Sequence, residues 1–128
     1  MDYKYIGILE PTLADKFDIS EHKNKPILVF DDRKQHVIDH HLADFGSVEN
    51  IEKVYNSLNN IIKKPDYVFY NAKTKGLEYY KNIDKNICVA VRVNPGKVLK
   101  VKSWYPANPN KINNRKKKTE EMKEELEN

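Results

Sequence analysis

After Pro65, apolar and polar residues alternate with a period of two, which is the period of a β-strand. The alternation predicts four strands, at residues 66–71, 77–83, 86–94 and 97–105, joined by short turns. Parallel neighbours would need crossover connections of about a dozen residues or more. The connections here are shorter, so the second half of the chain is predicted to form a four-stranded antiparallel meander.

Two helices are predicted ahead of the meander. The first has Asp31 or Asp32 as its N-cap and ends at Gly46. The second follows the N-cap Ser47 and continues to Pro65, because its apolar residues recur at intervals of three and four. The predicted fold class is α+β, with both helices on one face of the sheet and the other face open. The residues expected to pack together are Val54, Leu58 and Ile61 of the second helix and Val89, Val91, Leu99 and Val101 of the strands.

The same patterns divide the chain into three parts. Residues 1–26 are an N-terminal extension, in which residues 3–9 alternate weakly, as a short strand would. Residues 27–112 are the predicted domain, and its first four residues form either a buried strand or a hydrophobic staple for the first helix. Residues 113–128 are a charged tail, interpreted as solvated chain, with a charged helix as the alternative.

The charge is unevenly distributed along the chain. The formal net charge is +4, but residues 119–128 carry −4, so residues 1–118 carry +8. A body this basic favours a polyanionic partner, nucleic acid first and an anionic membrane surface second. The single cysteine, Cys88, excludes an internal disulfide and is expected to be a buried thiol. No stretch resembles a membrane span or a signal peptide, so no membrane is expected as a partner and the expected location is the cytoplasm of the cell that makes the protein.

A histidine cluster lies in the first predicted helix. Three of the four histidines, His36, His40 and His41, fall within six positions, and Arg33 lies one turn before them. Histidine exchanges protons near neutral pH, so this cluster beside an arginine suggests acid–base chemistry on a phosphate.

The alternation also assigns faces to the last two predicted strands. On the third strand, Ile87, Val89, Val91 and Val93 share one face, and Cys88, Ala90 and Arg92 share the other. On the fourth, the two sets are Leu99, Val101, Ser103 and Tyr105, and Val98, Lys100, Lys102 and Trp104. The cations would then stand near the aromatic residues Tyr67, Phe69, Tyr80 and Trp104. Such a surface suits phosphates and stacked bases.

Four short motifs, taken in their order, point to a known family. They are Arg33-Lys34-Gln35-His36-Val37-Ile38-Asp39-His40-His41, Lys64-Pro65-Asp66-Tyr67-Val68, Val89-Ala90-Val91-Arg92-Val93 and Val101-Lys102-Ser103-Trp104-Tyr105. Over about residues 27–112 the chain resembles the phage-encoded branch of the barnase, EndoU, colicin and RelE-like (BECR) superfamily of ribonucleases. That family commonly has His-Ile-x-x-Arg-His in the first helix; His36 and His41 match its histidines, and His40 stands at the arginine position.

The resemblance implies cleavage of RNA without a metal or other cofactor, often by a toxin or a phage-borne effector. The implied partners are RNA, with transfer RNA as one option, and an immunity or antitoxin protein. The implied location is the cytoplasm of the producing cell or of an infected or target bacterial cell.

Such cleavage needs a base for the attacking 2′-hydroxyl, an acid for the leaving 5′-oxygen and cations for the phosphoryl oxygens. The proton-transfer candidates are His36 with His41 or His40. The remaining candidates are Arg92 with Lys102 or Lys111 for charge stabilisation, Ser103 and Tyr105 for hydrogen bonds to phosphate, and Arg33 for binding RNA. His36 is expected to lie near Ser103 or Tyr105.

Two other interpretations compete with this one. His36 and His40, at i and i+4, could share a zinc ion with Asp39 or His22, although Val37 occupies the place of the catalytic glutamate in a His-Glu-x-x-His helix. Alternatively, the protein binds RNA or acts in host takeover without catalysis, and its histidines are structural.

Overall fold

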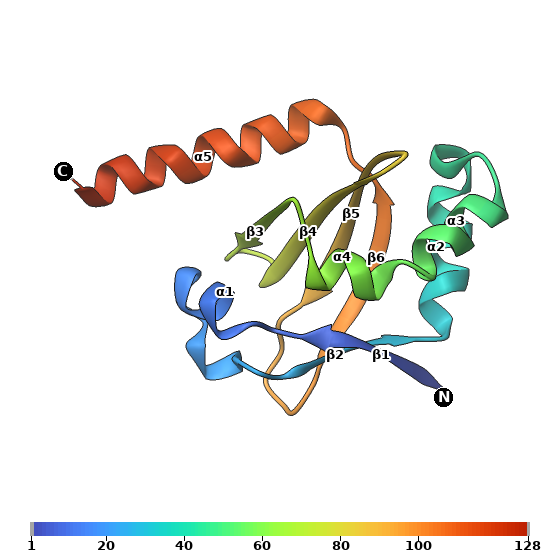
Figure 1. The fold of residues 1–128 in the computed structure, drawn as a ribbon, viewed down its shortest axis with the longest axis horizontal. Helices are drawn as coiled ribbons and strands as arrows, with labels where there is room; N and C mark the ends of the chain where they lie inside the picture. The colour runs from blue at the N-terminus through green and yellow to red at the C-terminus, as the bar shows by residue number, and fades with distance from the viewer. Residues whose placement is uncertain (1, 128) are drawn as a thin grey trace.

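A computed structural model describes residues 2–127, of which residues 119–127 are described by their backbone alone. These residues form six strands, five α-helices and one short 3-10 helix, Ser20–His22. The strands are β1 (Tyr3–Ile8), β2 (Pro26–Phe30), β3 (Tyr67–Asn71), β4 (Gly76–Ile83), β5 (Lys85–Arg92) and β6 (Leu99–Pro106). The α-helices are α1 (Pro11–Lys16), α2 (Asp32–Phe45), α3 (Val48–Tyr55), α4 (Leu58–Lys63) and α5 (Pro109–Glu127) (Figure 1). The α+β class is therefore confirmed.

The sheet contains the predicted meander and two further strands. Its order is β1-β2-β6-β5-β4-β3, and β3 to β6 pair antiparallel in sequence order. The prediction of four strands was incomplete, because β2 pairs in parallel with β6 through Ile27 opposite Leu99, and β1 pairs antiparallel with β2. The apolar run at residues 27–30 is too short for its pattern to distinguish a strand from a hydrophobic staple.

Three helices, α2, α3 and α4, connect β2 to β3 and pack on one face of the sheet. The core on this face contains every residue that the sequence analysis assigned to it, from Val54 on α3 to Val101 on β6. Ser47 caps α3 as predicted: its hydroxyl oxygen accepts a hydrogen bond from the main-chain N–H of Asn50 at 3.2 Å. Gly46 ends α2 in the left-handed conformation, with φ of 83°.

The prediction of one continuous second helix was wrong. The chain leaves the helix at Asn56 and Ser57, and α4 then covers β1 and β4. At this break the Ser57 hydroxyl donates to the Lys53 carbonyl at 3.0 Å, a local side-chain bond that competes with regular helical pairing. The apolar spacing continues across the break, which is why the pattern alone gave a single helix.

A β-bulge in β6 changes the faces predicted for that strand. Ala90 pairs with Ser103 and Val91 with Val101, so Lys102 is an extra residue without a partner on β5. Trp104 therefore joins Val101 in the helix-covered core, where its ring lies 5.7 Å from that of Tyr55. Ser103 and Tyr105 are on the opposite face, and Trp104 is not available to stack on a base.

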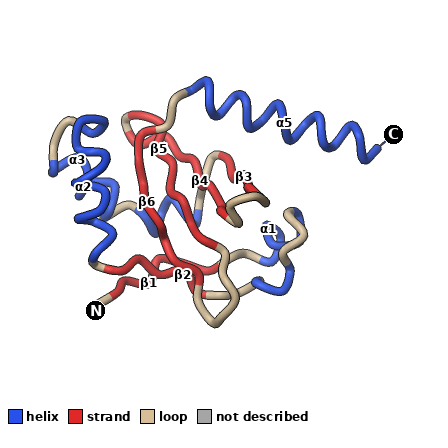
Figure 2. The backbone as a smooth tube through the Cα atoms, turned by 180° about the vertical axis from the view of Figure 1, so that it is seen from behind, coloured by secondary structure: helices blue, strands red, loops and turns tan. Residues whose placement is uncertain are grey.

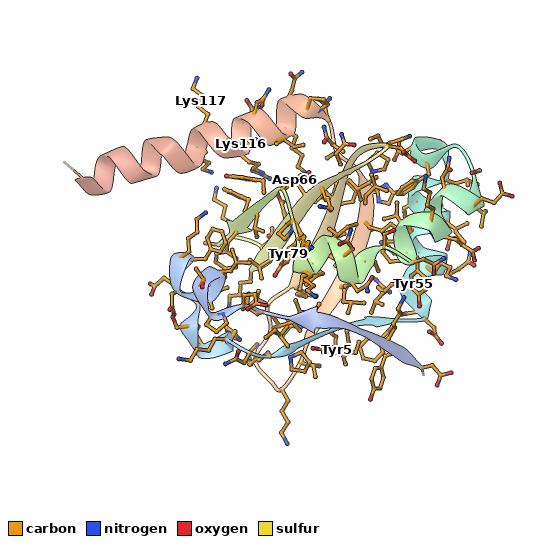
Figure 3. The ribbon with its side chains drawn as sticks, viewed as in Figure 1. Tyr5, Tyr55, Asp66, Tyr79, Lys116 and Lys117 are labelled. Carbon is orange, nitrogen blue, oxygen red and sulfur yellow. The ribbon has the colours of Figure 1, made fainter. Side chains whose placement is uncertain are left out.

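The face turned away from α4 is partly covered by α5, contrary to the prediction of an open face. Seen from behind, β4, β5 and β6 have no helix in front of them, and α5 runs past their upper ends (Figure 2). A second apolar cluster lies under the beginning of α5 and includes Phe69, Tyr80 and Cys88. Cations of α5 cover its rings: the Arg115 guanidinium lies 4.9 Å from the Phe69 ring centre, and Lys116 lies on the sheet side of the helix (Figure 3).

The N-terminal segment shares the main core. Ile6, Leu9, Ala14 and Ile19 are all buried in it, and Gly7 lies so close to α4 that a Cβ there would be 2.9 Å from Cγ2 of Ile62. Residues 3–19 thus contribute a strand to the sheet and side chains to the core. Within the described residues, no helix is both long enough and apolar enough to cross a membrane.

Candidate active site on the open face of the sheet

A cleft of about 710 Å³ lies on the face of the sheet turned away from α4, and six of the nine predicted site residues line it. Those six are His36, His41, Arg92, Lys102, Ser103 and Tyr105. The rest of the lining consists of Asn71, Lys73, Thr74, Gly76, Leu77, Glu78, Ala90, Val91 and Arg115. Helix α2 supplies the histidines, β4 to β6 supply most of the floor, and the β3–β4 turn and α5 complete the wall.

Cross-strand register explains the floor of the cleft. Glu78 pairs with Ala90 and Ala90 with Ser103, so these three side chains stand in one row across β4, β5 and β6. Ala90 leaves space in the middle of the row. Ser103 is only 6% exposed, and its Oγ has no hydrogen-bond partner among the residues described. A buried hydroxyl without a partner is costly, so a ligand oxygen in the cleft would satisfy it.

His41 is held from two sides. Its ring stacks on Tyr105, with centroids 5.2 Å apart and planes inclined by 25°, and its Nδ1 lies 3.1 Å from a carboxylate oxygen of Asp44. An Nδ1–H donated to that carboxylate orients the ring and leaves Nε2 as the atom for proton transfer. His41 is therefore positioned to exchange a proton through Nε2.

His36 has an environment that disfavours its charged form. Burial of its ring is the largest cause that lowers its pKa below the usual 6.5, and the charge of Arg33 adds to it. His40 and His41 lower the pKa further, and Asp39 opposes them. His36 is thus mainly neutral at pH 7, as a proton acceptor must be. His40 is exposed, with its ring 4.5 Å from that of His36, and does not line the cleft.

The predicted cations lie at different distances from the cleft. Arg92 and Lys102 line it, and Arg33 lies beside it, donating to the Lys102 carbonyl at 3.4 Å. Lys111 does not line the cleft, but its Nζ is 3.2 Å from the Tyr105 hydroxyl. Burial raises the pKa of Tyr105, so its hydroxyl stays protonated near neutral pH.

The sequence analysis missed Glu78 and Arg115. Glu78 Oε1 accepts hydrogen bonds from the Tyr80 hydroxyl at 2.6 Å and from Arg115 Nε at 3.3 Å. The pair brings a guanidinium from α5 to the cleft. The alternation of β4, with Glu78 on the face of Ala90, could have identified the carboxylate. Arg115 could not be found this way, because only tertiary packing brings α5 to the sheet.

The zinc interpretation requires a third ligand beside His36 and His40. Within the part of the chain whose side chains are described, no three His, Cys, Asp or Glu side chains are grouped as a metal site would need. Asp39 and His22 therefore do not complete the predicted set, and the arrangement that the structure offers is one of histidines, cations and hydroxyls.

Comparison with known proteins gives one match. A family model described as phage-Barnase-EndoU-ColicinE5/D-RelE like nuclease 3 matches residues 3–114. No curated protein and no solved structure matches the chain. The matched residues include β1 to β6 and every residue lining the cleft except Arg115.

Proposed function

Since the chain belongs to the phage-Barnase-EndoU-ColicinE5/D-RelE like nuclease 3 family, we propose that it is a metal-independent endoribonuclease acting as a toxin or phage-borne effector. Membership makes the domain a nuclease domain; RNA as substrate and the mechanism are the proposal. One observation carries it: a single cleft holds a neutral histidine, a carboxylate-paired histidine, cations and a buried hydroxyl without a partner among the described residues.

In the proposed reaction His36 takes the proton of the 2′-hydroxyl, and the 2′-oxygen forms a bond to the adjacent phosphorus. The bond from phosphorus to the 5′-oxygen breaks, and His41 gives that oxygen a proton. The products are a 2′,3′-cyclic phosphate and a 5′-hydroxyl end. Each positioned acid or base contributes about 10²- to 10⁴-fold to such a rate.

Charge develops on the phosphoryl oxygens during this attack. Arg92 and Lys102 are placed to stabilise it, and Ser103 and Tyr105 can donate hydrogen bonds to the same oxygens. Glu78 holds the Arg115 guanidinium beside the cleft, where it adds positive charge. Lys111 acts through the Tyr105 hydroxyl.

The test is incubation of the purified protein with total RNA in the presence of a chelator, followed by mapping of the cut ends. Cyclic phosphate and 5′-hydroxyl ends are expected, and DNA of the same sequence should stay intact because it has no 2′-hydroxyl. The substitution His36→Ala should lower the cleavage rate by about 10²- to 10⁴-fold with little change in RNA affinity.

The matched control is His22→Ala, which removes a histidine that does not line the cleft. Its cleavage rate should equal that of the parent. RNA binding without cleavage by the parent would instead support the non-catalytic RNA-binding function, and equal rates for His36→Ala and the parent would contradict the assigned role of His36.

A further inference from the structure

A second depression, here called the flanking groove, adjoins the cleft. It has a volume of about 360 Å³ and is lined by Phe30, Asp32, Arg33, Arg92, Asn94, Lys100, Val101 and Lys102. Arg92 and Lys102 line both the groove and the cleft. The two depressions therefore meet at these two side chains, and a strand lying in the cleft can extend into the groove.

The flanking groove is strongly cationic. Four of its eight lining residues are Arg or Lys, against one carboxylate, Asp32, which already pairs with Arg33 at 3.0 Å. Arg92, Lys100 and Lys102 form no ion pair with any carboxylate of the described side chains. An anion entering the groove would thus meet three cations that have no competing acidic partner among those side chains.

Two of these cations are placed directly opposite each other. Arg92 on β5 pairs with Lys100 on β6, and like charges facing each other across strands destabilise a sheet. Lys100 is also held in position, because its Nζ lies 5.2 Å from the Phe30 ring centre. A bound phosphate would turn this repulsion into two favourable contacts.

We infer that the flanking groove binds a second phosphate of the same RNA strand, next to the phosphate in the cleft. This inference rests on the proposed function and names its substrate class: single-stranded RNA with at least two consecutive phosphates. Arg92 and Lys102 contact both phosphates, whereas Lys100 contacts only the second. Substitution of Lys100 therefore tests phosphate binding in the flanking groove without changing the cleft.

The experiment uses the full chain and two DNA probes that cannot be cleaved by 2′-hydroxyl attack: a dinucleotide with one phosphate and a trinucleotide with two. Calorimetry at several salt concentrations should show on the order of tenfold tighter binding of the trinucleotide at low salt. The slope of log Kd against log salt concentration should be steeper for the trinucleotide than for the dinucleotide by about 0.7. This is the value for one more neutralised phosphate of a single strand. Lys100→Ala should reduce both differences and leave dinucleotide binding unchanged.

The matched control is Lys97→Ala, which removes an exposed lysine of the β5–β6 hairpin that lines neither depression. This variant should still bind the trinucleotide more tightly than the dinucleotide. Equal affinities of the parent for the two probes, or equal losses for Lys97→Ala and Lys100→Ala, would overturn the inference. Both variants are at exposed positions, and circular dichroism checks that they are folded.

A parallel assay with the corresponding RNA probes separates this inference from the proposed function. Cleavage of both RNA probes without any advantage of the second phosphate overturns the groove assignment alone. A Lys100-dependent advantage without cleavage of any RNA overturns the nuclease mechanism alone.

Discussion

Ser103 lies in the floor of the cleft with its hydroxyl buried and, among the described residues, unpaired. Ser103→Ala removes a buried polar group that gains nothing in the free protein. The free energy of unfolding in urea should rise by about 1 kcal/mol, while cleavage slows by about 10- to 10³-fold through loss of a donor to the phosphoryl oxygens. A loss of stability with unchanged cleavage would mean that the hydroxyl is structural.

His36 gives the activity its expected pH dependence. A general base must be unprotonated, so kcat/KM should fall as the pH drops through the pKa of His36, which lies below 6.5. His40→Ala removes one of the groups that lower this pKa, so the acidic limb should move to higher pH with the plateau unchanged. A limb that stays in place in this variant would assign the titration to another group.

The sequence identified six of the residues that meet in the cleft because each has a chemical signature. Histidines near an arginine, and cations on a strand with alternating residues, can be recognised in the amino-acid sequence. Ser103 and Tyr105 were placed beside the histidines for the wrong reason, since only the bulge at Lys102 brings them to the cleft face. Arg115 was missed because its pairing with Glu78 depends on the docking of α5.

Among the elements, the contact between β1 and α4 depends on Gly7. Its φ is +151°, and a Cβ there would be 2.9 Å from Cγ2 of Ile62. Gly7→Ala should therefore lower the free energy of unfolding by about 2–4 kcal/mol, from backbone strain and overpacking together. Urea denaturation measures the loss.

Gly96→Ala is the control for the backbone part of that loss. Gly96 has φ of +114°, but a Cβ added there would meet no atom within 4 Å, so this variant reports strain without a clash. Its loss should be about 1–3 kcal/mol. In a double-mutant cycle, Gly7→Ala should cost less when Ile62 is already Ala; strict additivity would contradict the steric explanation.

The elements themselves were predictable where a local pattern sufficed. Period-two alternation gave the meander, and Ser47 and Gly46 gave the helix boundary. The break at Asn56, the bulge at Lys102 and the parallel pairing of β2 depend on which partner each segment finds. Local spacing carries no information about such partners.

For the whole molecule, the basic charge of residues 1–118 predicts RNA binding that weakens steeply with salt. The acidic segment 119–128, whose side chains lie outside the described residues, should compete with RNA for the same cations. Its deletion should raise RNA affinity at low salt, with a smaller gain at high salt. Filter binding measures both, and a salt-independent affinity would contradict a surface that follows phosphates.

The parallel pairing of β2 with β6 also determines when the candidate site can form during synthesis. During synthesis, Ile27 can pair with Leu99 only after 72 more residues have been added. Until then the sheet beside the histidines of α2 is incomplete. Pairings this distant in sequence form late. A nascent chain that ends before β6 therefore carries no assembled cleft. Cutting the gene at Pro65 would separate the histidines from Arg92 and Ser103, so that two inert halves could be produced apart and then combined.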